Sequence, residues 1–578
     1  MNLLSLMKTG LTSLYQSIKR FPLTIILSAI TTALLIAVSR VYDGATQNAL
    51  SRLAMAAALG IPLTLSLALT FERRRPAKTV EIASYGLALG LLVLYRIFLL
   101  PEFTMVPVTR YIAVSIAVYL TFLFVPYFFR RRGFELYVIK VISRFLVTAI
   151  YSAVLFGGLA ITLLTIDLLL GIEVTSVFYA NVWMVVAGIF APCSFLAGLP
   201  GADWDSEQET YPSLLRVLLL YIVIPLILTY TSILYIYFLK TLVTLEWPKG
   251  TVSHLVLWYS VFSAGVIFLI HPLIRESKFA RFFTVWFPKL VLPALAMMFI
   301  AIGVRINAYG VTENRYFVVA LGLWVLGIMI YYSLAKQFRN IILPISLALV
   351  ALLTVVGPWS AYSVSKYSQN ARLEAIAAEY NMVKDASLQK PDRDITKEDQ
   401  KRIVSILDYF ADSHSLQAVP LLPSGFDFTN MEEVFGFSRK DVGLLPGQQT
   451  YFRLYTQVKT LDVQGYDHLL RSAGLESPVT VADYTVQYFP EDKEITVLRG
   501  DQEIYRMNLK TFAGQVVESH GADFLEVPAE DMTFLHEQDD LRVKLVFTGI
   551  SGNTEPDGQW TKLNIQELEF YLLLGTKK

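Results

Sequence analysis

The sequence is poor in the residues that most often build enzymatic and metal sites. It holds one cysteine and six histidines in 578 residues, so an intrachain disulfide and a cysteine-based metal site are both excluded. It has no HExxH, GxSxG or Walker motif, and no GxGxxG between a predicted strand and helix. We therefore expect no cofactor and no metal ion, and we favour a protein that is not an enzyme. Cys193 lies in an apolar run, which predicts a small core residue.

Charge is also scarce, and long apolar runs take its place. Charged residues make up 17% of the chain and hydrophobic residues 54%, with a mean hydropathy of +0.50. A membrane-spanning helix needs about 20 mostly apolar residues. The runs predict an α-helical polytopic bundle of about eleven transmembrane helices, at roughly 22–39, 50–71, 80–100, 111–129, 145–170, 177–199, 214–240, 252–272, 286–304, 317–335 and 341–361. Residues 1–21 read as an amphipathic helix on the membrane surface rather than a cleaved signal peptide.

Basic residues cluster after alternate spans, which predicts the orientation. The clusters are Arg73–Arg75 with Lys78, Arg130–Arg132 with Lys140 and Arg144, Arg275 with Lys278 and Arg281, and Lys336 with Arg339. With a cytoplasmic N-terminus all of these lie inside, giving about nineteen basic residues inside against about eight outside. An odd number of spans then places everything after Tyr362 outside the cytoplasm.

The charge balance divides the chain into two regions. Residues 1–360 hold 27 Lys+Arg against 14 Asp+Glu, and residues 361–578 hold 22 against 34. We expect a transmembrane domain over 22–361, a helical neck over 362–445 and a β-rich extracytoplasmic domain over 446–578. The acidic tail argues against binding nucleic acid.

The tail changes from helical to strand periodicity. Leu373, Ile376, Ala377 and Tyr380 share a helical face, and Thr396 followed by Asp399 predicts the start of a second helix. From residue 450 onward, alternating segments such as 451–458, 479–489 and 541–549 predict antiparallel strands, so the tail is expected to be an α+β domain.

One polar turn stands between two apolar runs at the predicted outer rim. It contains the candidate ligand residues Arg305, Tyr309, Thr312, Glu313, Asn314, Arg315 and Tyr316. Two guanidinium groups and a carboxylate could hold an anionic or polar ligand. The alternative is structural: Gly310 permits the turn, Thr312 caps the next helix and Glu313 complements its dipole.

Two further ionisable residues fall within predicted spans. Asp167 lies near the outer end of its run, and Arg96 lies near the outer end of the third. Intramembrane charge is often functional. Both residues could instead reach the headgroup region, since Arg96 is long enough to snorkel.

Three short patterns suggest chemistry but have simpler explanations. Asp203-Trp204-Asp205 is similar to a metal-binding DxD element, yet a solvated acidic loop explains it. The His536, Glu537, Asp539 and Asp540 cluster fits a hairpin end, and Arg499-Gly500-Asp501 fits a turn. Prolines at 62, 126, 225, 272, 293 and 344 interrupt or bound spans and could mark broken helices around a cavity.

Several segments resemble a known bacterial family. They are YGVTENRY (309–316), LYIYFLKTLVTLEWPKGTVS (234–253), GPWSAYSVSKYSQNARLE (357–374), ILDYF (406–410) and LDVQGYDHLL (461–470). Over about residues 20–470 the chain resembles the DUF4153-domain membrane proteins, a family of unknown function. The resemblance implies a multi-pass protein of the bacterial cytoplasmic (inner or plasma) membrane, and it implies neither an activity nor catalytic residues.

These observations leave three hypotheses. The first is an envelope-associated sensor, binding or scaffold protein with an acidic extracytoplasmic module, whose partners are membrane lipids and another envelope protein or cell-wall component. The second is a transporter or flippase with a mid-membrane polar site formed by Arg96 and Asp167. The third, a lipid-linked glycosyl or phosphoryl transferase, rests on architecture alone.

Overall fold

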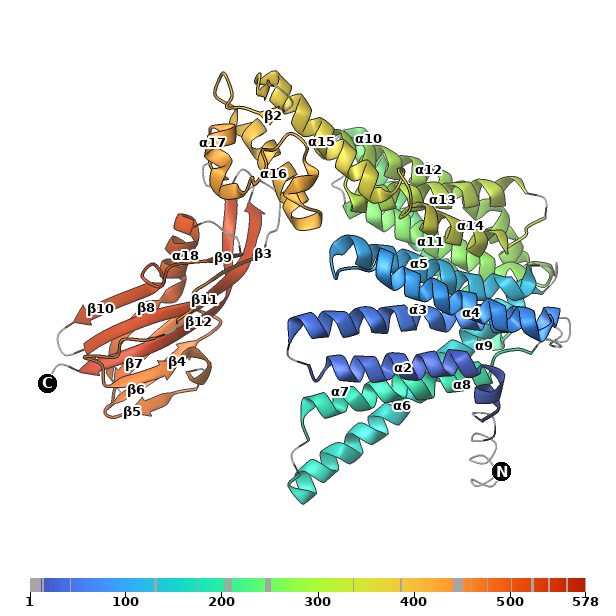
Figure 1. Ribbon diagram of the computed structural model, residues 1–578, viewed down its shortest axis with the longest axis horizontal. Helices are drawn as coiled ribbons and strands as arrows, with labels where there is room; N and C mark the ends of the chain where they lie inside the picture. Colours follow the sequence, from blue (N-terminus) through green and yellow to red (C-terminus); the bar gives the residue numbers. More distant parts are fainter. Residues whose placement is uncertain are drawn as a thin grey trace. The chain divides into compact units, whose positions relative to one another are not determined.

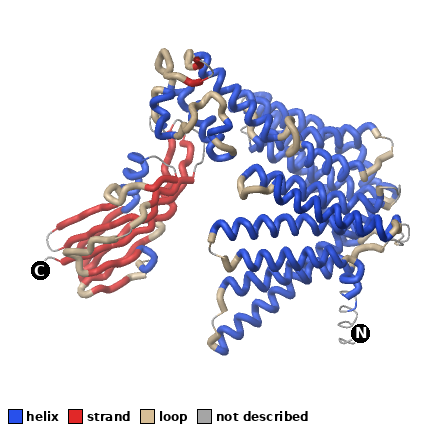
Figure 2. The backbone as a smooth tube through the Cα atoms, in the orientation of Figure 1, coloured by secondary structure: helices blue, strands red, loops and turns tan. Residues whose placement is uncertain are grey.

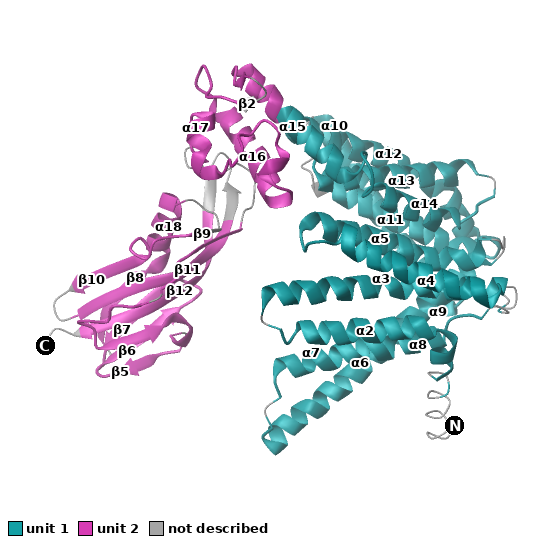
Figure 3. Cartoon of the chain, viewed as in Figure 1, with its two compact units in different colours: residues 1–372 teal, residues 373–578 magenta. Residues whose placement is uncertain are grey.

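The chain folds into two compact units, residues 1–372 and 373–578 (Figure 3). The computed structural model describes residues 12, 15–41, 43–128, 133–172, 174–201, 204, 210–244, 251–335, 337–384, 387–439, 451–458, 460–475, 477–500, 502–520, 524–538, 541–557 and 560–576. Most of the predicted surface helix at 1–21, and the predicted boundary between neck and β-domain at 445/446, lie outside these residues.

The first unit is a bundle of helices (Figure 1). Its α-helices are α2 (Pro22–Val38), α3 (Gly44–Arg74), α4 (Lys78–Leu94), α5 (Met105–Phe124), α6 (Phe134–Leu170), α7 (Ser176–Val185), α8 (Ala191–Ala197), α9 (Ser213–Val217), α10 (Ile224–Thr244), α11 (Thr251–Ile270), α12 (Lys278–Tyr309), α13 (Glu313–Leu334) and α14 (Ile342–Leu353). Short π or 3-10 turns extend several of them: η1 (Tyr95–Leu99), η2 (Val125–Tyr127), η3 (Val186–Phe190), η5 (Leu218–Val223) and η6 (His271–Arg275).

Within the described residues, nine helices are long and apolar enough to cross a membrane. The protein is therefore a multi-pass membrane protein, as the composition predicted. The expected count of about eleven is not confirmed, because α2 and α14 have 17 and 12 residues. At 1.5 Å per residue, 12 residues cover only about 18 Å of the roughly 30 Å hydrocarbon layer.

Side-chain contacts show which residues lie at each of the two polar ends of the bundle. At the first, which we call the basic end, Arg20 bonds Glu72 and Asn340 bonds Glu135. At the second, which we call the turn end because it holds the α12–α13 turn, Ser39 lies 3.3 Å from Asn181 and Tyr362 lies 2.6 Å from Thr109. The segments 20–39 and 340–362 therefore both run from one end to the other, although their helices are short.

Each of the three π turns among the described residues precedes a proline. η1, η3 and η5 end two residues before Pro101, Pro192 and Pro225 respectively. A proline removes an N–H and its ring clashes with the preceding turn, and a wider π turn relieves both effects. Pro62 and Pro293 lie inside α3 and α12 instead, so only some of the predicted interruptions occur.

The interior of the bundle is apolar and closely packed. Its main core includes Phe21, Tyr127, Ile224, Ile267 and Met298, each at most 1% exposed. Cys193 is buried, as predicted. In contrast, Leu168, Leu169 and Leu170 at the end of α6 are 67–77% exposed. Apolar surface on the outside of a membrane bundle faces lipid, which is the expected arrangement.

The second unit begins with a small helical core. It joins the last turns of α15 (Ala361–Glu379) to α16 (Lys397–Ser413) and α17 (Met431–Phe435), with a hairpin of β1 (Val383–Lys384) and β2 (Ser387–Leu388) and short turns η7 (Leu416–Ala418) and η8 (Phe428–Asn430). Leu373, Ile376, Ala377 and Tyr380 are all in this core, which confirms the predicted helical face.

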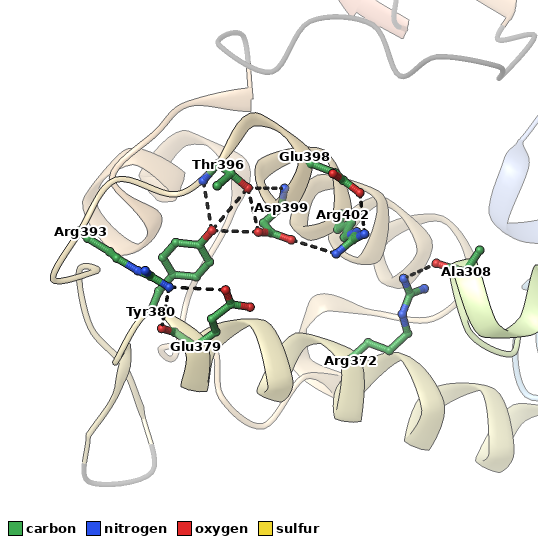
Figure 4. A network of polar contacts seen from close by, with 9 residues as sticks. All are labelled: Ala308, Arg372, Glu379, Tyr380, Arg393, Thr396, Glu398, Asp399 and Arg402. Carbon is green, nitrogen blue, oxygen red and sulfur yellow. Dashed lines mark hydrogen bonds and ion pairs between the residues drawn. The ribbon is translucent and has the colours of Figure 1, made fainter.

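A polar network holds the start of α16 (Figure 4). Thr396 caps the helix by accepting from the Asp399 N–H at 3.3 Å, as the sequence predicted. The Tyr380 hydroxyl donates to Asp399 Oδ2 at 2.8 Å, and Arg402 donates to Oδ1 at 3.1 Å. Burial opposes ionisation of Asp399, but the hydrogen bonds from Thr396 and Tyr380 and the charge of Arg402 leave the pKa of this carboxyl below its ordinary value.

The rest of the unit is a β-structure of two sheets (Figure 2). The strands are β3 (Tyr451–Tyr455), β4 (His468–Arg471), β5 (Val479–Val481), β6 (Tyr484–Phe489), β7 (Glu494–Arg499), β8 (Gln502–Asn508), β9 (Phe524–Glu526), β10 (Thr533–Gln538), β11 (Leu541–Asp557) and β12 (Trp560–Thr576). One sheet has the order β4-β12-β11-β3-β9, with β10 also on β11, and the other is the meander β5-β6-β7-β8. Every pair is antiparallel except β3 with β9.

Both sheets and α18 (Leu509–His520) contribute to one hydrophobic core. Tyr488 of the meander lies edge-on to Phe570 of β12 at 5.2 Å, and Phe512 of α18 stacks on Phe547 of β11 at 5.3 Å. The strand-rich tail is thus confirmed. β11 continues through Pro556 to Asp557 because it pairs with β12 along its whole length.

Candidate functional site

The α12–α13 turn depends on one glycine. Gly310 has φ +71°, a conformation that glycine adopts without strain. A Cβ there would lie 2.7 Å from the Arg372 Cδ and 2.9 Å from the Gln369 Nε2. Thr312 occupies the predicted N-cap position of α13, but its side chain makes no capping hydrogen bond. The turn is therefore held from outside rather than by its own cap.

The middle of α15 supplies the support. The last carbonyls of a helix have no partner within the helix. Gln369 Nε2 donates to the carbonyls of Tyr309 at 3.1 Å and Val311 at 2.9 Å, Arg372 donates to Ala308 O at 2.8 Å, and the Ser368 hydroxyl accepts from Val311 N at 2.9 Å. We call these three side chains the α15 clamp. Figure 4 shows the Arg372 contact.

Two other members of the predicted cluster also bind backbone. Arg315 donates to the carbonyls of Gly310 at 2.8 Å and Tyr309 at 3.2 Å, and its guanidinium lies 5.5 Å from the Tyr309 ring. The Tyr316 hydroxyl donates to Trp359 O at 2.6 Å. These contacts tie Arg315 and Tyr316 to the backbone around the turn.

Some of the cluster remains available to a partner. Arg305 and Asn314 are exposed, and neither forms a hydrogen bond or ion pair with another described residue. Arg315 lies within electrostatic reach of Arg305 and Arg372, so three positive charges gather here. Glu313, at 3% exposed, is the buried carboxylate of the group. The three arginine side chains could together attract an anion.

Arg96 and Asp167 are not joined to each other by any contact in the described chain. Arg96 Nη1 donates to Leu100 O at 3.2 Å, within its own turn of the chain. Asp167 is half-buried near the end of α6. The two residues thus do not share a polar site in this structure.

The shorter motifs gain no metal-binding geometry. Across the residues that can be placed, no group of three His, Cys, Asp or Glu side chains could hold an ion. Asp203, Asp205, Asp501, Asp539 and Asp540 lie outside the described residues. Their described neighbours make ordinary contacts. The Trp204 ring lies 6.4 Å from the Tyr137 ring, and the Arg499 guanidinium lies 5.7 Å from the Tyr484 ring. The His536 ring lies 4.6 Å from the Tyr505 ring, and Glu537 forms an ion pair with Arg542 at 3.5 Å.

The basic end holds a polar network that was not predicted from the sequence. Glu135 Oε1, at the start of α6, accepts from Asn340 Nδ2 at 2.7 Å and pairs with His271 Nδ1 at 3.1 Å. The Tyr332 hydroxyl donates to Asn340 Oδ1 at 2.9 Å. Asn340 and Tyr332 are each 2% exposed, whereas the side chains of Glu135 and His271 are 16% and 28% exposed. It connects α6, η6, α13 and the segment before α14.

A signal for this network was present in the sequence. Glu135 and His271 stand at the ends of apolar runs that the alternating topology places on the same side. A histidine and a carboxylate at the same level of a bundle can pair, whereas Asn340 could not be singled out from the polar residues around it.

Comparisons with known proteins support the resemblance. Residues 25–389 match the family described as Domain of unknown function (DUF4153). The uncharacterized protein PM1469 of Pasteurella multocida (strain Pm70) is 25% identical over 267 residues, which are 45% of this chain and 45% of that protein. The chain therefore spans less than half the length of that relative. No solved structure matches. Since the family match covers more than half of the sequence, the chain belongs to the DUF4153 family.

Proposed function

We propose that the protein anchors and presents its C-terminal unit at the outer face of a bacterial cytoplasmic membrane, as a binding or scaffold protein of the envelope. The observation that carries this proposal is the α15 clamp. The helix that leads into the second unit is hydrogen-bonded to the most distinctive turn of the bundle.

The charge distribution supports the orientation. Arg73 of the first basic cluster lies at the basic end, together with Glu135 and His271. Thr109 lies at the turn end, where it contacts Tyr362 of α15. If the basic end faces the cytoplasm, as the positive-inside rule favours, α15 is on the outer side. If all eleven predicted segments cross, the N-terminus is cytoplasmic. Residues 373–578 hold 34 Asp+Glu against 20 Lys+Arg, which favours a cationic envelope component as the partner.

Lipids are proposed as a second kind of partner at the turn end. A groove of about 340 Å³ is lined by Tyr316, Ala320, Leu323, Trp324, Val350, Leu353 and Thr354. These residues come from α13, α14 and the residue that follows α14, and the lining is mainly apolar. Such a groove fits a lipid acyl chain.

The test releases the clamp in the full chain. In the Gln369→Ala/Arg372→Ala variant we expect faster hydrogen exchange across residues 361–372, and loss of photocrosslinks from the second unit to its envelope partner in intact cells. Tyr367→Ala is the matched control, because Tyr367 is on the same helix and 77% exposed. Crosslinks that persist after the clamp has opened would contradict the proposal.

A transporter is the second candidate, and one observation favours it. Hydroxyl groups meet at the π turn η3 inside the bundle: Ser28 donates to Gly188 O at 2.5 Å, and Thr32 leaves no room for a Cβ on Gly188. π turns are often found at functional sites. Polar groups at this depth could line a path for a small solute.

The single cysteine tests this alternative. Cys193 lies on α8, three residues after η3 ends. A water-filled path would make Cys193 react with a small membrane-impermeant methanethiosulfonate in the folded protein. Complete protection under transport-permissive conditions in proteoliposomes would count against a transporter.

A further inference from the structure

A cluster of aromatic and basic side chains lies where α3 and η2 end and α6 begins. The Arg73 guanidinium lies 4.7 Å from the Tyr127 ring, and the Tyr127 ring lies 4.8 Å from that of Tyr137. The Trp204 ring lies 6.4 Å from the Tyr137 ring, and Lys140 Nζ lies 5.4 Å from the Trp204 ring. The cluster is at the basic end of the bundle.

One group in this cluster lacks a partner. Tyr137 is 1% exposed, yet its hydroxyl has no hydrogen bond within the described part of the chain. Buried hydroxyl groups are nearly always hydrogen-bonded. Two other buried hydroxyls of α6, those of Thr148 and Ser152, also have no hydrogen bond within the described part of the chain, but a serine or threonine hydroxyl can turn to a carbonyl of its own helix. A tyrosine hydroxyl cannot reach its own helix backbone, so it needs a partner from outside.

The charge around Tyr137 is positive. Arg73, Arg20 and Glu72 all lie within electrostatic reach of its hydroxyl. Both carboxylate oxygens of Glu72 are taken by Arg20, at 2.6 and 2.8 Å. Arg73 forms no hydrogen bond or ion pair with any other described residue, so its charge is not neutralised by the placed part of the protein.

The start of α6, the helix that carries Tyr137, also favours a negative charge nearby. α6 starts after Gly133 without a side-chain cap, and it is 37 residues long. The first N–H groups of a helix point outward and carry the positive end of its dipole. An anion near Tyr137 would lie beside these groups.

We propose that the Arg73–Tyr137 cluster binds the phosphate group of an anionic phospholipid headgroup. A guanidinium and a hydroxyl both donate to phosphate oxygens, and arginine suits the shape of this group. The aromatic rings match the interfacial level at which headgroups lie, and basic pockets between transmembrane helices are known to bind lipid headgroups. This inference does not depend on the proposed role of the C-terminal unit.

The test measures lipid-dependent thermal unfolding of the full chain in detergent. We expect phosphatidylglycerol to raise the unfolding temperature of the wild type, and phosphatidylcholine and inorganic phosphate to have little effect. Arg73→Gln and Tyr137→Phe should each weaken the apparent affinity for phosphatidylglycerol by about tenfold, because each removes a hydrogen bond to a charged group. Tyr119→Phe, half-exposed on α5, and Arg52→Gln, on the same helix as Arg73 but near its other end, are the matched controls.

Three results would overturn the proposal. The first is unchanged phosphatidylglycerol binding in Arg73→Gln. The second is equal stabilisation by inorganic phosphate, which would point to a soluble ligand. The third is strong destabilisation of Tyr137→Phe without lipid, which would mean that the hydroxyl already has a partner in the protein; the expected result is an unfolding temperature equal to or above that of the wild type.

Discussion

The Glu135 network makes the sharpest prediction about stability. Glu135→Ala removes the acceptor for both Asn340 Nδ2 and His271 Nδ1. Asn340 is 2% exposed, so its amide cannot turn to water in the folded state. A buried donor left without its partner costs about 1–3 kcal/mol. The His271 side chain is 28% exposed, so losing its contact with Glu135 adds less than the loss of a fully buried pair would. We expect Glu135→Ala to lower the free energy of unfolding by about 2 kcal/mol.

Two variants separate the charge from the hydrogen bonds. Glu135→Gln keeps an oxygen that can accept from Asn340, so we expect a loss of only about 1 kcal/mol. His271→Ala combined with Glu135→Ala should cost less than the sum of the two changes, by about 1 kcal/mol or more, because the side chains are in contact.

Chemical denaturation in mixed micelles measures these differences. Hydrogen exchange over residues 335–341 shows whether the loss is local to the network. Glu102→Ala is the control, because Glu102 is an exposed carboxylate in the loop before α5. If Glu135→Ala unfolds within about 0.5 kcal/mol of this control, the network does not stabilise the bundle and the reasoning fails.

Three further predictions follow from particular contacts. Gly310→Ala should destabilise the turn end by about 1–3 kcal/mol and speed hydrogen exchange in α15, since the new Cβ meets the clamp at a positive φ; normal exchange in α15 would refute this. Gly188→Ala should lower the unfolding temperature of the bundle, because its Cβ collides with Thr32; a neutral effect would show that η3 can move away from α2. Folding lowers the pKa of Asp399 below its ordinary value of 3.8, so the stability that the ionised carboxyl contributes is complete above that value and is lost as pH falls through the lower folded value. Asp399→Asn should remove this acid-dependent loss of stability from the unfolding of the second unit. An unchanged pH profile would refute the assignment.

Hydrophobic run lengths predicted most of the bundle because a lipid-facing helix has to be apolar along its length. The same signal did not show that the helix within 341–361 is only 12 residues long, with the chain continuing through Gly357-Pro358 to the turn end. Period-two patterns located the strands, but the parallel β3–β9 pair has no local signature, since pairing partners far apart in sequence leave no periodic trace.

The candidate site was only partly predictable from the sequence. Its polar residues are unusual between two apolar runs, which is why Arg305 and Arg315 stood out. The clamp was not foreseen, because Gln369 and Arg372 are ordinary in an amphipathic helix until the carbonyls that they bind are placed beside them. The Tyr137 cluster was missed for a similar reason, since a tyrosine in an apolar helix looks like core packing.

In the proposed orientation, the α15 clamp and the C-terminal unit both lie on the outer side of the membrane. A topology reporter fused after Lys578 tests this most directly, with alkaline phosphatase active only outside the cytoplasm and a fluorescent protein folding only inside it. The account predicts an active phosphatase and a dark fluorescent protein. A bright fluorescent protein with inactive phosphatase would contradict it.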